Sequence, residues 1–333
     1  MRCANGESEH GAFRKLHQHR SSCLVFKKSF ILKRLACKMW TGFALCSVAC
    51  MHAIVRTQPE KTNVIRVGHS NLAQASTIAR GLALVPPNQT ERFTVEIEPG
   101  VYRERVWVNA SLGPVTLTGL GDVPDDVLLI FHCCPNGDGS PRCSNGTVDA
   151  ACLPQHAGAG MSRGVETLLI EADDFILSNM SVANDACGYD SKRAAQSETV
   201  QMLADRIFVT NVRLYGAQDT VYSGSDTNRQ YLLRTYVNGS CDSIFGESSM
   251  VIEDCDIAIT DHITAARSTP GKSMYLFLNS RLVRPSPGQF NHPAMDGRTD
   301  LGRAWGSGAH VLYKNCWMDK HIASVCVLRS VYP

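Results

Sequence analysis

A strand-like segment recurs six times in the second half of the chain. Each copy begins with three apolar residues and carries Asn, Thr or Asp at its fifth position. The copies are Phe175–Val182, Ile207–Leu214, Tyr231–Asn238, Met250–Ile257, Tyr275–Leu282 and Val311–Met318. Their starts are 32, 24, 19, 25 and 36 residues apart. This spacing is typical of a solenoid, in which a turn of chain buries its inner face only by stacking on its neighbours.

The repeat predicts an all-β fold, a single-stranded right-handed parallel β-helix. We expect the polar side chain at the fifth position to turn inward and to hydrogen-bond the coils above and below. An antiparallel β-sandwich is the alternative, but turns in sandwiches come every 8–12 residues, and the intervals here are longer. The only amphipathic helix expected in the body spans Ala73–Leu84.

Charge is unevenly distributed along the 333 residues. Residues 1–38 hold nine Lys and Arg against two Glu, whereas the other 295 residues hold 24 basic and 29 acidic groups. A folded body with a net charge of −5 argues against a nucleic-acid-binding protein, which concentrates positive charge on its folded part. The hydrophobic fraction of 44% is too high for a disordered chain.

The basic stretch is followed by Met39–Val55, which contains no Asp, Glu, Lys or Arg. Basic residues before a short apolar run resemble a secretory signal or a signal anchor, and a buried core helix is the alternative. We therefore expect residues 1–60 to be a leader and residues 61–333 to be a secreted folded domain with no stable membrane partner, unless the apolar run is an uncleaved anchor.

Sequons and cysteines also favour export. Five Asn-x-Ser/Thr triplets follow the apolar run, at Asn88, Asn109, Asn145, Asn179 and Asn238, and predict a glycoprotein. Nine of the 14 cysteines also follow it, and four lie in one Gly/Pro/Asn-rich stretch: Cys133, Cys134, Cys143 and Cys152. Such a loop gains most from disulfides in an oxidising compartment. A zinc site is the competing interpretation, but no CxxC pair supports it.

Two acidic residues follow neighbouring repeats. Asp219 and Asp242 are 23 residues apart, close to the length of one coil, so we expect them to stack on the outer face about 5 Å apart. Like charges at that range raise one pKa, so that one carboxyl can donate a proton while the other stays ionised. Alternatively, both aspartates merely terminate strands.

Three further residues suit ester chemistry. Arg303 can bind a carboxylate through two hydrogen bonds and keep it ionised as a nucleophile. Trp305 offers a flat apolar face on which a sugar ring can pack. Gln218 is a neutral donor next to Asp219 that can stabilise a developing oxyanion.

In this combination the chain resembles the pectin methylesterases (pectinesterases), over residues 63–322. Glu98–Val106 resembles the family's G-x-Y-x-E segment. Ala204–Arg206 with Gln218–Thr220 is similar to its G-D-R and Q-D-T motifs. Arg229–Tyr231 with Asp242–Gly246 resembles R-Q-Y and D-F-I-F-G, and Leu301–Trp305 resembles L-G-R-P-W. The motifs, taken together and in order, are highly specific.

The resemblance implies a role for each matching residue. Asp242 is the implied nucleophile, and Asp219 the acid that protonates departing methanol and then the base that activates water. Gln218 and Gln196 would form the oxyanion hole, and Arg303 would hold Asp242.

The resemblance also implies that Trp305, Tyr222 and Phe245 contact the polysaccharide, which is methyl-esterified pectin. No metal or other cofactor and no nucleic-acid partner is expected, and the protein is expected to be a monomer.

The sequence departs from the family at several points. The strand that opens with Gln196 is rewritten, and Gln201 competes with Gln196 for the oxyanion role. Cys241, Ser243 and Ala304 replace the family's Val, aromatic residue and Pro. After Ala323 the family's Pro-x-Gly-Trp segment is missing, so we expect a C-terminally truncated domain.

Two other functions stay open, the first because of these departures and the second because it shares the predicted coil. One is a catalytically weakened or silent β-helix that only binds polysaccharide. The other is a pectate lyase, which would need an acidic calcium cluster.

Overall fold

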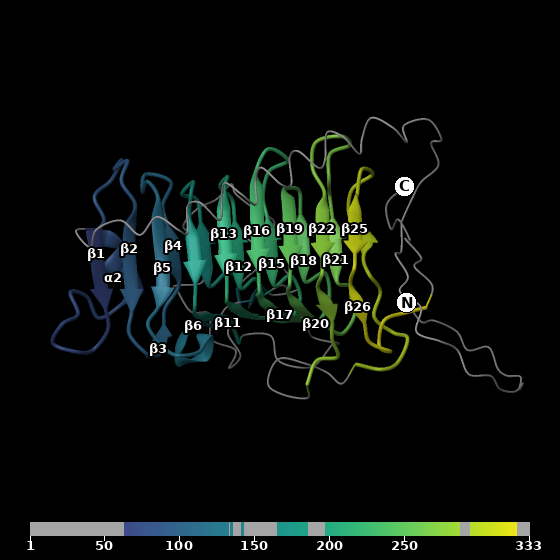
Figure 1. Ribbon diagram of the computed structural model, residues 1–333, viewed down its shortest axis with the longest axis horizontal. Coiled ribbons are helices and arrows are strands. Elements are labelled where there is room, and N and C mark those ends of the chain that lie inside the picture. The colour runs from purple at the N-terminus through teal and green to yellow at the C-terminus, as the bar shows by residue number, and fades with distance from the viewer. Residues whose placement is uncertain are drawn as a thin grey trace, which may run out of the picture.

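Three long parallel sheets run side by side along an elongated molecule (Figure 1). The computed structural model describes residues 63–132, 134–135, 141–142, 165–185, 197–286 and 294–324. Successive strands of the chain enter the first, second and third sheet in turn and then return to the first, so each circuit adds one coil. This is the predicted parallel β-helix.

The strands of each sheet follow one another in chain order. The first sheet contains β1 (Val64–Val67), β2 (Phe93–Ile97), β5 (Val115–Gly119), β10 (Ile176–Ser178), β13 (Ile207–Thr210), β16 (Arg229–Leu233), β19 (Ser249–Glu253), β22 (Tyr275–Leu278) and β25 (Val311–Lys314). The second contains β3 (Gly100–Arg103), β6 (Val127–Phe131), β11 (Ser181–Asn184), β14 (Arg213–Tyr215), β17 (Tyr236–Gly239), β20 (Asp256–Ile259), β23 (Arg281–Leu282) and β26 (Trp317–Met318).

The third sheet carries the residues of greatest chemical interest. It contains β4 (Val106–Val108), β9 (Leu168–Ile170), β12 (Val200–Met202), β15 (Val221–Ser223), β18 (Ile244–Gly246), β21 (Thr264–Ala266) and β24 (Arg303–Ala304). A short antiparallel pair, β7 (Cys134–Pro135) and β8 (Pro141–Arg142), lies outside the three sheets. The 3-10 turn η2 spans Pro124–Asp126.

The six predicted repeats all lie in the first sheet, as β10, β13, β16, β19, β22 and β25. One was aligned one residue too late, because Gln230, rather than Tyr231, pairs with both Ile207 and Met250. The residue at the turn of this coil is Arg234, whose φ of 48° lies in the left-handed region, whereas the other five repeats have Asn or Asp there. The polar Thr235 next to it explains the wrong register.

The expected role of the fifth position is wrong in one respect. Its side chains lie at the surface and do not turn inward, because Asn and Asp occupy the left-handed turn that ends each strand, with φ values of 49–55°. Coil-to-coil hydrogen bonds do form there: Asn211 Nδ2 donates to Asn179 Oδ1 at 2.8 Å, and Asn315 Nδ2 to Asn279 Oδ1 at 3.4 Å. The inward position is the next residue, for example Val212 or Cys255.

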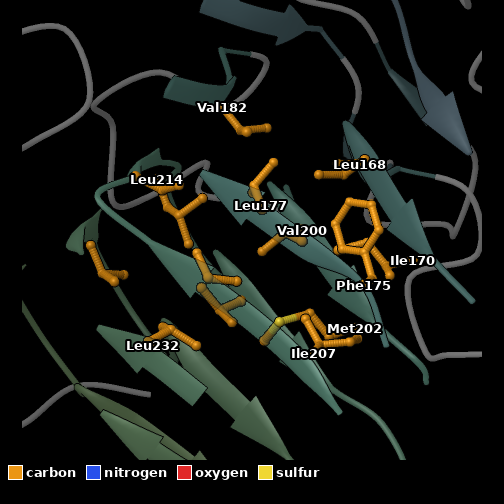
Figure 2. Packing of buried hydrophobic residues seen from close by; sticks show 14 of the residues in the cluster. Leu168, Ile170, Phe175, Leu177, Val182, Val200, Met202, Ile207, Leu214 and Leu232 are labelled. Atoms are coloured by element: carbon orange, nitrogen blue, oxygen red, sulfur yellow. The ribbon is translucent and has the colours of Figure 1, made fainter. Parts of the chain in front are cut away.

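The interior is a column of stacked aliphatic side chains. Leu177 of β10, Val182 of β11 and Val200 of β12 face one another from the three sheets, and the neighbouring coils contribute Leu214 and Leu232 (Figure 2). Each fully buried side chain of this size contributes about 1.5–3 kcal/mol through the hydrophobic effect. The column holds the coils in register, and the register fixes which outward-facing side chains become neighbours.

A short helix, α2 (Ile78–Ala83), covers the first coils and buries Ile78 and Leu82. It is shorter than the expected Ala73–Leu84 because Thr77 caps its N-terminus, where the Thr77 hydroxyl accepts from Arg80 N–H at 3.2 Å. The carboxylate of Glu104 also accepts from the first turn, from Ile78 N–H at 2.7 Å and Ala79 N–H at 3.0 Å.

Several expectations concern residues outside the described ranges. For secretion these are Met39–Val55, Asn145 and the cysteine side chains of the loop around Cys143, and for the oxyanion hole it is Gln196. Asn88 is exposed, but Asn238 is only 3% exposed and the folded chain leaves no room for a glycan there. Cys241, Cys255 and Cys316, which are described, are free thiols. Within the described ranges, the helices are all too short or too polar to cross a membrane.

Candidate active site

Asp219 and Asp242 lie one above the other on adjacent coils. Val221 of β15 pairs with Ile244 of β18, and each aspartate stands two residues before its strand. Asp219 N–H donates to Cys241 O at 3.1 Å, so the register extends to the aspartates. Both have left-handed backbones, with φ of 65° and 51°, which Asp tolerates better than most residues. Their exposed fractions are only 3% and 4%.

Inward-facing threonines hold the corner that carries these aspartates. Thr220, directly after Asp219, is fully buried, and its hydroxyl donates to Asn238 O at 3.2 Å. On the preceding coil, the Thr199 hydroxyl donates to Tyr215 O at 2.7 Å in the same way. Because the inward hydroxyl ties the corner to the end of the second sheet, the preceding residue faces outward.

Arg303 binds both oxygens of the Asp242 carboxylate. Its Nε donates to Oδ1 at 2.8 Å and its Nη2 to Oδ2 at 2.5 Å. Arg303 belongs to β24, two coils beyond Asp242, and pairs in register with Ala265 of the intervening β21. The small side chain of Ala265 leaves room for the arginine to reach back. The hydrogen bonds to Asp242 raise the pKa of Arg303, and the fixed positive charge stabilises the ionised carboxylate.

Aromatic side chains flank the carboxylates on the third sheet. Tyr222 and Phe245 pair in register on adjacent strands, and their ring centroids are 4.9 Å apart. Trp305 is partly exposed, and its ring centroid is 6.0 Å from that of Phe245. The guanidinium carbon of Arg267 lies over the Trp305 ring, 4.9 Å from its centroid. All three aromatic residues predicted to contact a polysaccharide therefore come together in one cluster with Ala265.

The expected glutamines have separate positions. Gln218 is half-buried, and its backbone carbonyl accepts a hydrogen bond from Ser197 N–H at 3.0 Å. Gln201 is buried on β12, in register with Tyr222, and its Nε2 donates to the Glu198 carboxylate. An amide held by Glu198 is a poor candidate for the oxyanion donor. Gln196 lies outside the described residues, so its expected role stays a prediction.

Cys241 stands next to Asp242 but is unsuited to nucleophilic chemistry. Burial, together with the negative charges of Asp242, Asp261 and Asp219, raises the pKa of its thiol well above the ordinary range. The thiol is the protonated species near neutral pH, and only a thiolate is a good nucleophile. Cys241 is therefore not a candidate nucleophile of this site.

Two of the motifs shared with the family form the scaffold and lie apart from the carboxylates. Glu104 caps helix α2, and the Tyr102 hydroxyl donates to Glu98 O at 2.8 Å. Asp205 Oδ1 accepts from Arg229 N–H at 2.7 Å and from Arg229 Nε at 3.0 Å, which ties two coils together. Burial alone would raise the pKa of Asp205, but the hydrogen bonds from Arg229 outweigh it and lower the pKa.

The sequence reasoning missed three residues at the register position of the two aspartates. Glu166, Glu198 and His262 each stand two residues before a strand of the third sheet, as Asp219 and Asp242 do. Glu198 stands 21 residues before Asp219, and Glu166 stands 32 residues before Glu198. Both steps are coil-like in length, but they differ too much for the sequence alone to place the two glutamates. On the coil after His262 lies Asp300, whose Oδ2 is 3.4 Å from Nδ1 of His262.

Known proteins are similar to this sequence over most of its length. Pectinesterase 31 from Arabidopsis thaliana is 28% identical over 273 residues, covering 79% of this chain and 76% of its own. Pectinesterase 1 from Olea europaea is 26% identical, covering 80% and 65%, and a pectinesterase from Sitophilus oryzae is 27% identical, covering 68% and 63%. The chain thus spans three quarters of the first relative and just under two thirds of the other two.

Solved structures share the fold. The pectin methylesterase from Aspergillus niger superposes with a TM-score of 0.63 at 23% identity, covering 80% of this chain and 79% of its own. The carrot enzyme gives 0.62 at 19% identity, covering 80% and 76%. The family model named Pectinesterase matches residues 148–329, more than half of the chain and the part that contains both aspartates and Arg303. The chain therefore belongs to the pectinesterase family of carboxylic ester hydrolases.

Proposed function

We propose that the protein is a pectinesterase that hydrolyses the methyl esters of galacturonate residues in pectin to pectate and methanol. The observation that carries the proposal is the two-point bond from Arg303 to Asp242, with Asp219 stacked one coil away. It supplies one carboxylate held ionised beside a second carboxyl of different environment, which is what a two-step ester hydrolysis requires.

In the first step an Asp242 oxygen attacks the ester carbonyl carbon, and the carbonyl electrons move to its oxygen. Gln218, and by family resemblance Gln196, would donate hydrogen bonds to that oxyanion. When the tetrahedral intermediate collapses, Asp219 gives its proton to the departing methoxide, which leaves as methanol. The product is an anhydride between Asp242 and the galacturonate.

In the second step Asp219, now ionised, takes a proton from water as the water attacks the galacturonate carbonyl. The anhydride bond breaks, Asp242 leaves as a carboxylate, and Asp219 is protonated again. Arg303 keeps the same two hydrogen-bonding sites available to Asp242 at the start and the end of the cycle. Every proton is returned, so the residues of the chain close the cycle themselves.

Pectin is the proposed polymer partner. The cluster of Tyr222, Phe245 and Trp305 next to the carboxylates supports this, because aromatic faces pack on sugar rings. A related pectin methylesterase, 22% identical to this chain, has been solved in complex with a hexasaccharide. We further propose that the protein is a monomer secreted to the extracellular space or cell wall, in line with the basic and apolar leader and with the exposed sequon at Asn88.

A silent polysaccharide-binding protein is the second candidate, supported by the rewritten strand Gln196–Gln201, whose last residue is held by Glu198. Methanol release from highly methyl-esterified pectin separates the two. The enzyme produces methanol and an equal amount of new carboxylate, whereas a binding protein produces neither and still sediments with pectin. Absence of methanol from a folded, pectin-binding sample would reject the proposed activity.

A further inference from the structure

The two aspartates belong to a longer row of outward-facing residues. Leu168, Val200, Val221, Ile244 and Thr264 pair in sequence across five strands of the third sheet. The residues two positions before them are therefore also neighbours, one strand spacing of about 4.8 Å apart. Glu104 has the same position before β4, but its carboxylate is bound to the start of helix α2. The next four members along the axis, Glu166, Glu198, Asp219 and Asp242, are called the carboxylate row here, and His262 and Asp300 follow them.

All four acidic members of the row are buried. Glu198 is fully buried and Glu166 is 1% exposed, so these two are as enclosed as the aspartates that follow them. Water screens charges weakly at such depth, and carboxylates on adjacent coils repel one another strongly. A proton bound in the middle of the row relieves that repulsion.

Arginines stand at the two ends of the row. Arg105 binds the Glu166 carboxylate and Arg303 binds the Asp242 carboxylate, so each end member is paired with a positive charge. The two middle members, Glu198 and Asp219, are adjacent to each other. The Gln201 amide donates to Glu198 and thereby favours its ionised form. The proton of the middle pair then belongs on Asp219.

We propose that Glu198 is a positioning residue for Asp219, and that its buried carboxylate keeps on Asp219 the proton that departing methanol requires. This inference rests on the proposed function and assigns a purpose to a residue outside the matching motifs. The acid Asp219 thus has the anionic Glu198 as its neighbour on the preceding coil. The nucleophile Asp242, on the following coil, is instead paired with the positive charge of Arg303. One row gives two carboxyls opposite roles.

The groups that face this pair from each neighbouring coil all enter the balance. On the β9 side, Glu166 forms an ion pair with Arg105. On the β18 side, Asp242 forms an ion pair with Arg303. The Cys241 thiol is neutral, and the Tyr222 hydroxyl is neutral as well, because burial, Glu247 and Glu198 raise its pKa. Asp261 and His262 stand beyond Asp242, and His262 is close to both Asp261 and Asp300.

The test is the pH profile of kcat/KM for methanol release. Glu198→Gln keeps the shape and removes the charge, so Asp219 loses its proton at lower pH, and the alkaline limb moves down by about one to two pH units. Glu198→Asp restores the charge, and its limb stays within about half a pH unit of the unsubstituted protein. Glu96→Gln, the same change on β2 in the first sheet, serves as the matched control and leaves the profile unchanged.

A purely structural role for Glu198 would lower the rate equally at every pH, and an unmoved alkaline limb in Glu198→Gln would overturn the proposal.

Carbon-13 NMR of labelled aspartate, with Asp219 assigned through Asp219→Asn, supplies a readout independent of turnover. Asp219 is expected to titrate at lower pH in Glu198→Gln than in the unsubstituted protein. Identical titrations reject the role of Glu198 even if the protein releases no methanol, and a failed assay with a shifted titration rejects the activity alone. Should Glu198→Gln not fold, an Asp219 that titrates in the ordinary aspartate range in the unsubstituted protein also overturns the proposal.

Discussion

Arg303 donates hydrogen bonds to both carboxylate oxygens of Asp242 from a strand two coils away, from Nε to Oδ1 at 2.8 Å and from Nη2 to Oδ2 at 2.5 Å. The sequence separation of 61 residues hides this contact, and the regular stacking of the third sheet creates it. The fork shape of the guanidinium fixes the plane of the carboxylate as well as its charge. The geometry therefore places a preorganised anion beside Asp219, and its value for catalysis can be measured.

Replacing Arg303 by lysine should keep the charge and lose the fork. We expect Arg303→Lys to lower kcat by about 100-fold or more, since a single ammonium cannot hold both oxygens. Arg281→Lys is the matched control, because Arg281 makes the same two-point bond to Asp256 at 2.6 and 2.5 Å in the second sheet. Equal activity of the two variants would show that the fork at Asp242 has no catalytic role.

Enlarging Ala265 should disturb the same contact without touching either partner. Ala265 is 2% exposed and occupies the register position between Phe245 and Arg303. A leucine there would compete with the arginine for space, so we expect Ala265→Leu to lower kcat at least about tenfold. Ala265→Gly is expected to stay within about threefold of the unsubstituted rate. A fully active leucine variant would mean that the arginine does not need this space.

The scaffold contact of Asp205 should make stability depend on pH. The hydrogen bonds from Arg229 outweigh burial and leave the pKa of Asp205 below its ordinary value. A depressed pKa contributes stability above the unfolded value of about 3.9, and that stability is lost as the pH falls through the folded pKa. Asp205→Asn should therefore lower Tm by several degrees at pH 7, and the difference should shrink below about pH 4.

Asp173→Asn is the control for this measurement. Asp173 lies 3.3 Å from Arg206 with 57% of its side chain exposed, and exposed ion pairs contribute about 0–1 kcal/mol. Its Tm at pH 7 is expected to change by no more than about 2 °C. A Tm difference for Asp205→Asn that persists unchanged at pH 3 would contradict the charge-based account.

The fold could be predicted because a solenoid repeats its core. The repeats of the first sheet are long and end in Asn or Asp, so their spacing is visible in the sequence. Register was harder: Arg234 takes the left-handed turn in place of Asn, and this moved one strand by a residue. The third sheet is built mostly from three-residue strands such as Val200–Met202. Such strands are too short to be recognised from an alternation of apolar and polar residues in the sequence.

The candidate site was predictable where one coil separates like residues, as for Asp219 and Asp242. The bond from Arg303 to Asp242 spans two coils. The sequence indicated Arg303 as a possible carboxylate partner, but the strand pairing was needed to place it beside Asp242. Glu198 was missed because its neighbours Gln201 and Thr199 carry no signal of a buried carboxylate. Coil lengths vary between 20 residues, from Gln230 to Met250, and 62 residues, from Val106 to Leu168. Outward neighbours therefore follow from the strand pairing and cannot be counted reliably from the sequence.

The central claim is that Asp242 is the nucleophile of a pectin methylesterase. Asp242→Asn keeps the size of the side chain and removes the attacking anion, and Asp256→Asn makes the same change on β20 in the second sheet. Initial rates of methanol release from methyl-esterified pectin should fall by at least about 1,000-fold in Asp242→Asn and stay within twofold in Asp256→Asn. A folded Asp242→Asn variant that retains a tenth or more of the unsubstituted rate would contradict the account.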